Sequence, residues 1–403
     1  MQPLLTELLS LEGIEVENHW NFGDHIVLKV EAKAVCAICP RCGEESSNIH
    51  QNHWHTAHDL SIFDKAVFLK YNRRQFKCKK CKKPFSESLH FIGERRQYTD
   101  RFAERIVKQL VHSDIHNVAK NNHITDDLVQ SMLEYLSKKK WKFKPGQIKR
   151  LGIDEIALRK GQGDYIAVLV DLDRNELVGM APSRKHTDIK KVLSSWGDEV
   201  LSQIEEVSID LSGNYRGLIK KYLPNAATVA DRFHVMKVIN DELNQARNSA
   251  KREVNTIEDK NERERLNQVL SKSKYALLKP AGNLTENQNL KLGEVKKNFP
   301  TLAKMHQQKE DFRNIFETAR DWRDGATRLM DWMDNAKDTF KHSFGTLYRW
   351  FGEITAYFET HTTSGAVEGI NNRLKLIKRL GYGFRNFENF RLRCLMCWQL
   401  SIS

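Results

Sequence analysis

The sequence predicts a multidomain α/β protein, in which a small cysteine-containing β module and a short helical module precede a larger domain. Three observations predict this fold class. Residues 1–91 combine strand-length apolar runs, such as His25–Val30 and Ala66–Tyr71, with five of the seven cysteines. From Asp100 to Lys140 the apolar residues follow helical spacing, and residues 150–231 contain near-continuous strand-like runs.

The composition is that of a folded globular protein. Of the 403 residues 40% are hydrophobic, and 65 Lys and Arg against 52 Asp and Glu give a net charge of +13. This excludes a disordered or collagen-like chain, and the length suggests roughly two or three domains. No apolar run is long enough to span a membrane, and residues 1–21 lack the basic segment of a secretory signal, so we expect a cytoplasmic protein. The excess positive charge makes a polyanion the expected partner.

Four of the cysteines form two C-x2-C pairs, Cys39 with Cys42 and Cys78 with Cys81. Two such pairs can supply the four thiolates of a closed zinc site, and Gly43 allows a tight turn after the first pair. We therefore predict a structural zinc ion that supplies much of the folding free energy of residues 30–90; the alternative is four buried thiols. We expect Cys36 to be a spare thiol, and Cys394 and Cys397 to be buried structural residues in an apolar run.

A basic stretch surrounds the second cysteine pair. Lys65–Lys83 contains nine Lys or Arg residues among 19 and no acidic residue, and aromatic residues are interleaved with the charges. This pattern favours binding to a phosphate backbone over a solvated charged face. The candidate DNA contacts in this stretch are Arg73, Arg74, Lys77, Lys79 and Lys80.

Residues 92–145 are predicted to form a helix-turn-helix domain. Three short segments with helical spacing follow one another with tight connections, and Thr125 followed by two aspartates is a helix-start signal. Such a module presents one helix to the major groove of DNA, and Asp126–Leu136 is the candidate for that helix.

The rest of the chain is predicted to be one α/β core that a helical segment interrupts. The apolar runs of residues 146–235 indicate strands buried on both faces, so helices should cover both sides of the sheet. Residues 236–350 are highly charged and helix-periodic, which predicts an all-helical insertion. Residues 351–403 would complete the core with a helix from Ser364 to Leu380 and a basic tail.

Acidic residues follow two of the predicted strands. Asp154 and Asp210 each end a buried apolar run, and open α/β sheets bind ligands at the carboxyl ends of their strands. Two neighbouring carboxylates repel each other unless a divalent cation or a proton compensates their charge. Taken singly, each is better explained as a strand-end or capping residue.

A third acid lies on the last predicted helix. Glu368 shares a polar face of that helix with Asn371, Asn372 and Lys375. Gly369 lowers helix stability, which predicts the close approach of another backbone or of a ligand. The three acids, together with a zinc module and a helix-turn-helix, indicate a catalytic site rather than three separate capping residues.

The whole pattern resembles one known family, the ISL3 group of bacterial insertion-sequence transposases, whose core is RNase H-like. The resemblance covers nearly the whole chain. It rests on the segments Cys39–Cys42, Cys78–Cys81, Tyr98–Glu104, Gly152–Glu155, Ser208–Tyr215, Ala230–His234, Glu368–Lys375 and Gly381–Asn386.

The resemblance implies that Asp154, Asp210 and Glu368 form a DDE triad that holds two Mg²⁺ or Mn²⁺ ions. Such a pair of ions activates the attacking oxygen and stabilises the leaving 3′ oxygen, so that water cleaves a strand and a 3′-OH transfers it. Lys375 and Arg379 would then contact phosphates or the transition state; the alternative is a solvated basic face. Asp231 and His234 match the (C/D)-x2-H signature of such cores, and their role stays open.

The implied partners are double-stranded DNA, as terminal inverted repeats and target, and further copies of the chain in a homodimer or higher oligomer. The implied location is the bacterial cytoplasm, with nucleoid association when DNA is bound. One alternative is a zinc-dependent DNA-binding regulator with an inactive nuclease-like core; the presence of all three acids argues against it. The other is a hydrolytic nuclease without strand transfer; the long helical insertion favours the transposase, because DNA ends must be paired and shielded.

Overall fold

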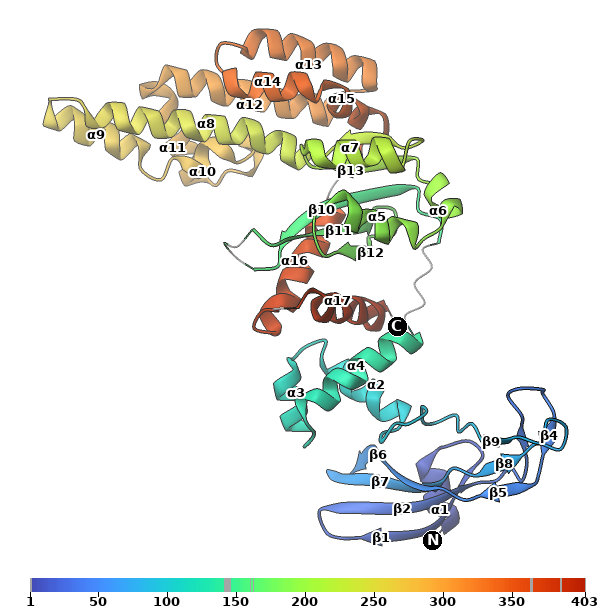
Figure 1. The fold of residues 1–403 in the computed structure, drawn as a ribbon. Coiled ribbons are helices and arrows are strands. Elements are labelled where there is room, and N and C mark those ends of the chain that lie inside the picture. Colours follow the sequence, from blue (N-terminus) through green and yellow to red (C-terminus); the bar gives the residue numbers. More distant parts are fainter. Residues whose placement is uncertain are drawn as a thin grey trace. The chain divides into compact units, whose positions relative to one another are not determined.

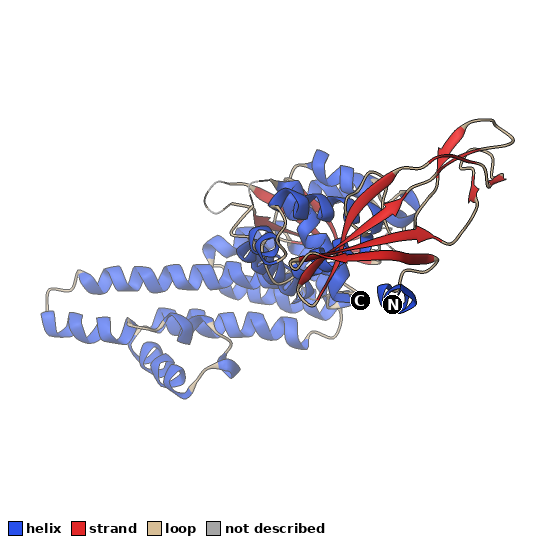
Figure 2. Ribbon diagram, turned by 90° about the horizontal axis from the view of Figure 1, so that it is seen from below, coloured by secondary structure: helices blue, strands red, loops and turns tan. Residues whose placement is uncertain are grey.

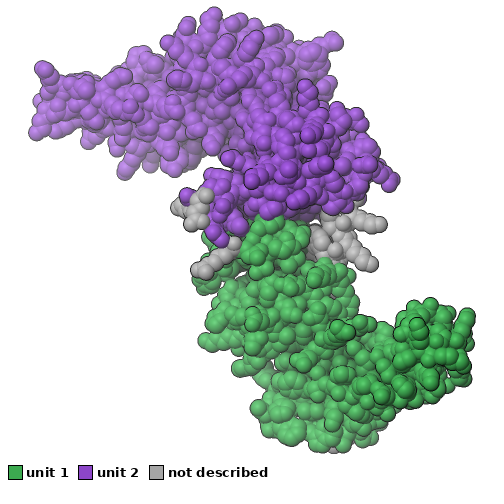
Figure 3. Space-filling view, in the orientation of Figure 1, with its two compact units in different colours: residues 1–142, 377–403 green, residues 143–376 purple. Residues whose placement is uncertain are grey.

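The computed structural model describes residues 2–140, 146–159, 161, 163–362, 365–384 and 386–402. The chain divides into two compact units, one of residues 1–142 with 377–403 and one of residues 143–376 (Figure 3). The finer division into five domains stays a prediction. Ser364, the predicted start of a helix, lies outside the described residues.

The first unit begins with a helix and a four-stranded sheet (Figure 1). The sheet has the order β1-β2-β7-β6, with β2 and β7 parallel and the other neighbours antiparallel. Leu28, Val30, Val67 and Leu69 are almost completely buried in its core. The elements are α1 (Gln2–Leu9), β1 (Ile14–Asn21), β2 (His25–Ala32), β6 (Trp54–Ile62) and β7 (Lys65–Asn72).

The two cysteine pairs lie in a separate, smaller group of strands. These strands are β3 (Ala37–Ile38), β4 (Glu45–Ser46), β5 (Ile49–Gln51), β8 (Gln75–Lys77) and β9 (Pro84–Ser86). Apart from the cysteines, its buried apolar side chains are Phe76 and Phe85. The expectation that zinc supports all of residues 30–90 is therefore wrong for β6 and β7, because these strands share the core of the four-stranded sheet.

Three short helices follow, as predicted: α2 (Asp100–Gln109), α3 (Ile115–Asn121) and α4 (Asp126–Lys140). Each start is capped, since Thr99, Asp114 and Thr125 accept hydrogen bonds from the backbone N–H groups of the first turns. Their apolar faces form one buried cluster. The helix-turn-helix prediction is thus correct in its elements.

The C-terminal helix α17 (Phe387–Ile402) packs against this helical module. Met396 joins its core, and Gln130 donates a hydrogen bond to Asn389. Arg393 is 2% exposed and donates to the carbonyl oxygens of Leu110 and Ser113. Part of the predicted basic tail is therefore structural, and Cys394 and Cys397 are buried as expected.

The second unit contains a five-stranded sheet of order β12-β11-β10-β13-β14. Strands β10, β13 and β14 are parallel to one another, and β11 and β12 are antiparallel to their neighbours. The strands are β10 (Arg150–Ala157), β11 (Tyr165–Asp171), β12 (Glu176–Ala181), β13 (Glu206–Ile209) and β14 (Ala227–Ala230). The helices α5 (His186–Ser194), α6 (Asp198–Ser202) and α7 (Gly213–Tyr222) lie between them in sequence.

Successive residues of β10 point to opposite faces of this sheet. Leu151 and Ile153 join the buried cluster that contains the apolar side chains of α5 and α7. On the opposite face, Gly152 lies against Val367 of helix α16 (Gly365–Leu380). Both faces are therefore covered by helices, as the apolar strands predict.

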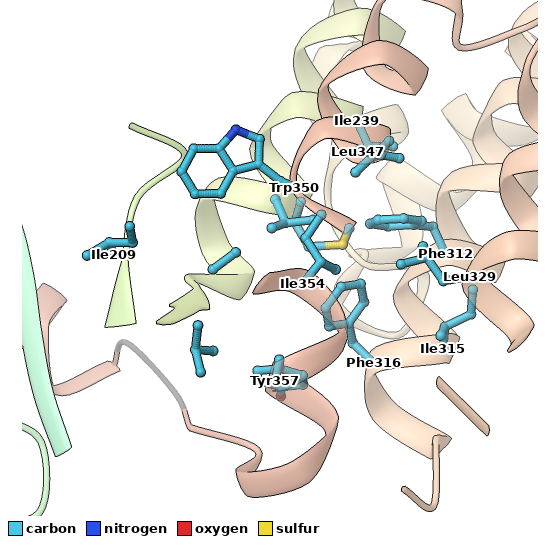
Figure 4. Packing of buried hydrophobic residues seen from close by; sticks show 14 of the residues in the cluster. Ile209, Ile239, Phe312, Ile315, Phe316, Leu329, Leu347, Trp350, Ile354 and Tyr357 are labelled. Carbon is cyan, nitrogen blue, oxygen red and sulfur yellow. The ribbon is translucent and has the colours of Figure 1, made fainter. Parts of the chain in front are cut away.

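Residues 232–360 form helices and contain no strand, as predicted for this fully described segment. The helices are α8 (Arg232–Asn255), α9 (Lys260–Leu270), α10 (Lys274–Leu278), η1 (Ala281–Asn283), α11 (Glu286–Asn298), α12 (Pro300–Thr318), α13 (Trp322–Ala336), α14 (Lys341–Arg349) and α15 (Phe351–Thr360). The long helices run alongside one another (Figure 2). One buried core joins these helices to the sheet (Figure 4). It contains Ile209 of β13, Phe316 of α12, Trp350, and Ile354 and Tyr357 of α15. Among the described residues, no helix is long and apolar enough to cross a bilayer.

One buried residue of the helical segment makes stability depend on pH. His306 on α12 is 1% exposed, and neither ring nitrogen has a hydrogen-bond partner among the described residues. Burial, reinforced by the charge of Lys309, lowers the pKa of His306 to about 4. Between pH 6.5 and 4, His306 is protonated in the unfolded chain but stays neutral in the folded chain. Protonation therefore favours the unfolded state, and the free energy of unfolding falls as the pH is lowered from about 6.5 towards 4.

We expect His306→Leu to remove this dependence. The wild-type chain should lose about 2 kcal/mol of unfolding free energy through His306 between pH ~7 and pH ~5, and the variant should not. Urea unfolding of both proteins at the two pH values measures the difference. Equal losses in the two proteins would contradict the assignment.

Candidate active site and zinc site

Three aspartates lie side by side at one edge of the five-stranded sheet. Ile153 pairs with Ile209 across β10 and β13, and Ile209 pairs with Ala230 across β13 and β14. The next residues are Asp154, Asp210 and Asp231, so three carboxylates lie in the same register where the parallel pairing stops. Strands β13 and β14 end there, whereas β10 continues to Ala157. The prediction that a strand ends at Asp210 is confirmed, but the prediction that one ends at Asp154 is wrong, because β10 continues to Ala157 as the antiparallel partner of β11. The pairing of β10 with β13 brings the two aspartates next to each other.

The carboxylate of Asp210 is held in an unfavourable environment. Its Oδ1 atom is buried and has no hydrogen-bond partner among the described residues. Burial, followed by the charges of Glu155 and Asp154, raises the pKa of Asp210 to about 6, although His234 opposes the shift. The site therefore concentrates negative charge that a bound cation would stabilise.

Helix α16 can pack close to the three aspartates because Gly152 of β10 has no side chain. Gly152 and Asp154 share one face of β10, and Val367 and Asn371, four residues apart, share one face of α16. Val367 lies where a side chain of Gly152 would project. One helical turn further on, Asn371 Nδ2 donates to Asp154 Oδ2 at 2.5 Å, while Asn371 Oδ1 is buried without a partner in the described structure.

Glu368 lies on the same helix but is exposed. Within the described residues, the four cysteines are the one group of three or more potential ligands whose ligand atoms lie within 4.8 Å of one another. The carboxylates of Asp154, Asp210 and Glu368 are thus not gathered into one compact set. Lys375 is exposed on α16, as is Arg379. The predicted close approach of another chain segment to Gly369 is wrong, because no described atom lies within 4 Å of its added Cβ position.

Two residues near the row escaped the sequence analysis. Glu155 is largely buried and lies 3.8 Å from Arg184. Tyr215 on α7 is completely buried, and its pKa is strongly raised by burial and by the charge of Glu155. Its hydroxyl has no hydrogen bond of good geometry among the described residues. Both residues lie in segments on which the family resemblance rests. Their sequence context alone, an acid next to another acid and a tyrosine in a helix, does not indicate a functional residue.

Asp231 and His234 form a local pair at the start of α8. Asp231 caps the helix by accepting from the N–H of Phe233 at 2.9 Å, and its other oxygen lies 2.9 Å from His234 Nδ1. This hydrogen bond, together with the charges of Asp231, Asp154 and Asp210, raises the pKa of His234 although burial opposes it. His234 therefore places a potential positive charge beside the aspartates.

The contact between Gly152 and α16 gives a testable prediction. A Cβ at residue 152 would lie 2.8 Å from Val367 Cγ2 and 2.9 Å from Leu172 Cδ2, so Gly152→Ala should destabilise the fold by about 1–3 kcal/mol and displace α16. Gly369→Ala, which adds a Cβ in open space, should instead stabilise by about 0.5–1 kcal/mol. Denaturant unfolding measures both changes, and equal effects would contradict the close packing of α16.

The four cysteines have the geometry of a zinc site. The Sγ atoms of Cys39 and Cys81 are 3.5 Å apart, those of Cys42 and Cys78 also 3.5 Å, and those of Cys42 and Cys81 3.7 Å. A tetrahedron with Zn–S bonds of about 2.3 Å has edges of about 3.8 Å, so the thiols fit such an ion. The N–H of Cys81 points at Cys78 Sγ from 3.4 Å and lowers the pKa of that thiol to about 6, which favours the thiolate.

The turn after the first cysteine pair also fits the prediction. Gly43 has a φ of +73°, the conformation for which glycine was expected there, and its N–H donates to the carbonyl of Cys39. Cys36 lies outside the cluster and donates to Glu45. It is a spare thiol, as expected.

The candidate DNA contacts differ in their surroundings. Lys77, Lys79 and Lys80 are exposed. Arg74 instead forms a bidentate ion pair with Glu87, with side chains only 11% and 6% exposed. Arg73 is partly buried, and its guanidinium lies over the ring of Tyr71. Among the described residues, the three lysines have no such ion pair or ring contact, so their charges remain available for phosphates.

Comparison with known proteins identifies the family. A model for the DDE-type transposases of ISL3 insertion sequences, described as "Transposase", matches residues 151–394, which is more than half of the chain. The chain belongs to the ISL3 transposase family. A second model, "zinc-finger of transposase IS204/IS1001/IS1096/IS1165", matches residues 37–81 of this transposase, and a third, "Helix-turn-helix domain of transposase family ISL3", matches residues 87–137. The transposase thus carries a zinc-ribbon and a DNA-binding helix-turn-helix domain.

Curated relatives agree with this membership. The transposase is 27% identical over 387 residues to "Transposase for insertion sequence element IS1001" of Bordetella parapertussis, covering 91% of this chain and 90% of the relative. It is also 27% identical over 257 residues to "Transposase for insertion sequence element IS1557" of two Mycobacterium tuberculosis strains, covering 59% of this chain and 57% of the relative.

Proposed function

We propose that this ISL3 transposase is a DDE enzyme with an RNase H-like core, which binds the ends of an insertion sequence and catalyses Mg²⁺- or Mn²⁺-dependent strand cleavage and strand transfer. The observation that carries the proposal is the pair of carboxylates on neighbouring parallel strands, Asp154 and Asp210, with α16 packed against their face of the sheet. Residues 236–350 are then the helical insertion of that core.

The surroundings of these carboxylates fit a hard divalent cation. Asp210 Oδ1 is buried without a partner, and repulsion from Asp154 and Glu155 contributes to its raised pKa. Carboxylate oxygens are the ligands that Mg²⁺ and Mn²⁺ prefer. Asp154 and Asp210 would hold the ions, and Glu368 would complete the set from the exposed side of α16.

When bound, the ions supply a Lewis acid for both the attacking and the leaving oxygen of an in-line displacement at phosphorus. The chain's own residues orient the ligands. Asn371 donates to Asp154 and thereby fixes the rotation of that carboxylate, as outer partners of metal ligands do. His234, held by Asp231, places positive charge near Asp154 and Asp210 and so limits their mutual repulsion.

DNA recognition is assigned to the first unit. The helix-turn-helix would present α4 to the major groove, and the exposed Lys77, Lys79 and Lys80 of the zinc ribbon would contact phosphates. Arg74 is given a different role, because its guanidinium is largely buried and forms a bidentate pair with Glu87. We propose that it holds the ribbon against the loop that follows β9.

The proposal is tested with DNA that contains an element end, labelled on one strand. The full chain should release a product with a 3′-OH in Mg²⁺ or Mn²⁺, and should bind without cleaving when neither ion is added. Binding without cleavage in every metal would favour the regulator with an inactive core. The DNA that flanks the coding region is searched for inverted repeats, which would give the sequence for the assay.

A further inference from the structure

A pocket of about 510 Å³ opens between α8, α10 and α12, and Gly365, the first residue of α16, borders it. Its lining combines apolar side chains, such as Met236 and Leu278, with two aromatic rings. These rings belong to Phe233 and Tyr275, which are 57% and 61% exposed. Large aromatic side chains left this exposed offer flat surfaces on which a planar ligand can stack.

The pocket also has a positive lining. It contains Arg232, Lys237, Lys279 and Arg313, and no carboxylate from the described residues lines it. Arg232 pairs with Glu317 at 3.0 Å and Arg313 lies 4.0 Å from Glu310, but Lys237 has no ion-pair partner within the described ranges. The charge that remains favours an anion.

Two polar atoms of the lining residues are buried and unpartnered. Neither Asn240 Oδ1 nor Arg313 Nε has a hydrogen-bond partner among the described residues. A side-chain amide offers a donor and an acceptor together, which matches the edge of a nucleobase. Stacking rings, cations and an amide together fit a nucleotide better than a simple anion or an apolar molecule.

The pocket adjoins the candidate active site along the chain. Phe233 directly precedes His234, which interacts electrostatically with Asp154 and Asp210. Gly365 precedes Glu368 by three residues on α16, a rise of about 4.5 Å along the helix. A strand whose phosphate lies at the carboxylates could place a neighbouring nucleotide in this pocket.

We propose that the pocket holds one unpaired nucleotide of the DNA strand being cleaved, next to the scissile phosphate. This inference rests on the proposed function, because it takes Asp154 and Asp210 as the site of cleavage. A base stacked in a duplex cannot reach the rings, so the nucleotide must leave the helix. Phe233 and Tyr275 stack against its base, and Lys237 contacts its phosphate.

The test compares two element-end duplexes of one sequence, one fully paired and one mismatched at the nucleotide next to the cleavage position. The full chain should bind the mismatched duplex more tightly, because the cost of unpairing is already met. Tyr275→Ala should lower affinity for the mismatched duplex by roughly 5- to 150-fold, as expected for one lost stacking contact. The loss should be smaller for the paired duplex, because the variant can bind it with the base still stacked in the helix. Lys237→Ala should weaken both equally, since it removes a phosphate contact.

Tyr348→Ala is the matched control, because Tyr348 is 71% exposed in the same helical segment but lies outside the pocket; it should bind both duplexes like the wild type. A preference for the mismatch that survives in the combined Phe233→Ala and Tyr275→Ala variant would overturn the inference. So would equal wild-type binding of the two duplexes, even if Mg²⁺-dependent cleavage upholds the proposed function. A Tyr275-dependent preference without any cleavage would support the pocket and reject the catalytic proposal.

Discussion

Asp154→Asn and Asp210→Asn should each lower the rate of strand cleavage by about 10³-fold or more, while affinity for element-end DNA stays within a few-fold of wild type. The reason is that both carboxylates would hold metal at the chemical step, where charge stabilisation contributes several kcal/mol, and about 1.4 kcal/mol corresponds to tenfold in rate. Affinity comes mainly from phosphate and base contacts elsewhere. Single-turnover cleavage and gel-shift binding measure the two quantities. Asp198→Asn, an exposed acid on α6, is the control and should cleave normally.

Two residues of α16 sharpen this prediction. Glu368→Gln should abolish cleavage like the aspartate variants if Glu368 is the third ligand. Asn371→Ala should cost only about 10- to 100-fold, as is typical for a residue that orients a ligand. Cleavage that persists in Glu368→Gln at high Mg²⁺ would move the third ligand to another acid. The first candidate is the largely buried Glu155, whose charge contributes to the raised pKa of Asp210.

Cys81→Ser, or removal of zinc, should unfold the ribbon and abolish tight binding to element ends. The ribbon has little apolar core besides Phe76 and Phe85, whereas a structural zinc ion contributes roughly 10–16 kcal/mol to folding. The four-stranded sheet beside it has its own core and should stay folded. Hydrogen exchange should therefore rise in residues 36–51 and 73–88 but not in β1, β2, β6 and β7.

Binding should change in a defined way in the same variant. If Lys77, Lys79 and Lys80 grip phosphates, fewer counterions are released, and log K should depend less steeply on log salt concentration. Cys36→Ser is the matched control, because Cys36 lies outside the cluster and should leave exchange and binding unchanged. Equal affinity and an equal salt slope in the zinc-free protein would show that the ribbon does not contact DNA, which would leave protein pairing as its role.

Local patterns in the sequence were sufficient for several parts of the fold. The C-x2-C pairs, the strand-like runs and Thr125 at a helix start each carry their signal within a few residues, because metal ligation, periodicity and capping are short-range. The all-helical segment was found for the same reason. Asp210 was predicted at a strand end, where the structure places it, whereas the same prediction for Asp154 is wrong because β10 continues to Ala157.

Pairings between distant segments could not be predicted in this way. The parallel pairing of β2 with β7 joins two segments on either side of the first cysteine pair, so the four-stranded sheet and its core were missed. From the sequence, Arg74 and Arg393 were assigned to positively charged segments that face DNA. In the folded chain Arg74 pairs with Glu87, and Arg393 donates to the carbonyl of Leu110. Asn371 was placed on a polar helix face, but its contact with Asp154 spans 217 residues.

The central claim is that the carboxylates of this transposase catalyse strand transfer, and joining of DNA tests it most directly. A labelled element end with a free 3′-OH is incubated with the full chain, a supercoiled target and Mg²⁺, and covalently joined product is measured. We predict joining by the wild type, none when Mg²⁺ is omitted, and none by Asp154→Asn. Nicking of the target without joining would contradict the transposase assignment in favour of a nuclease, and joining by Asp154→Asn at the wild-type yield would contradict the site.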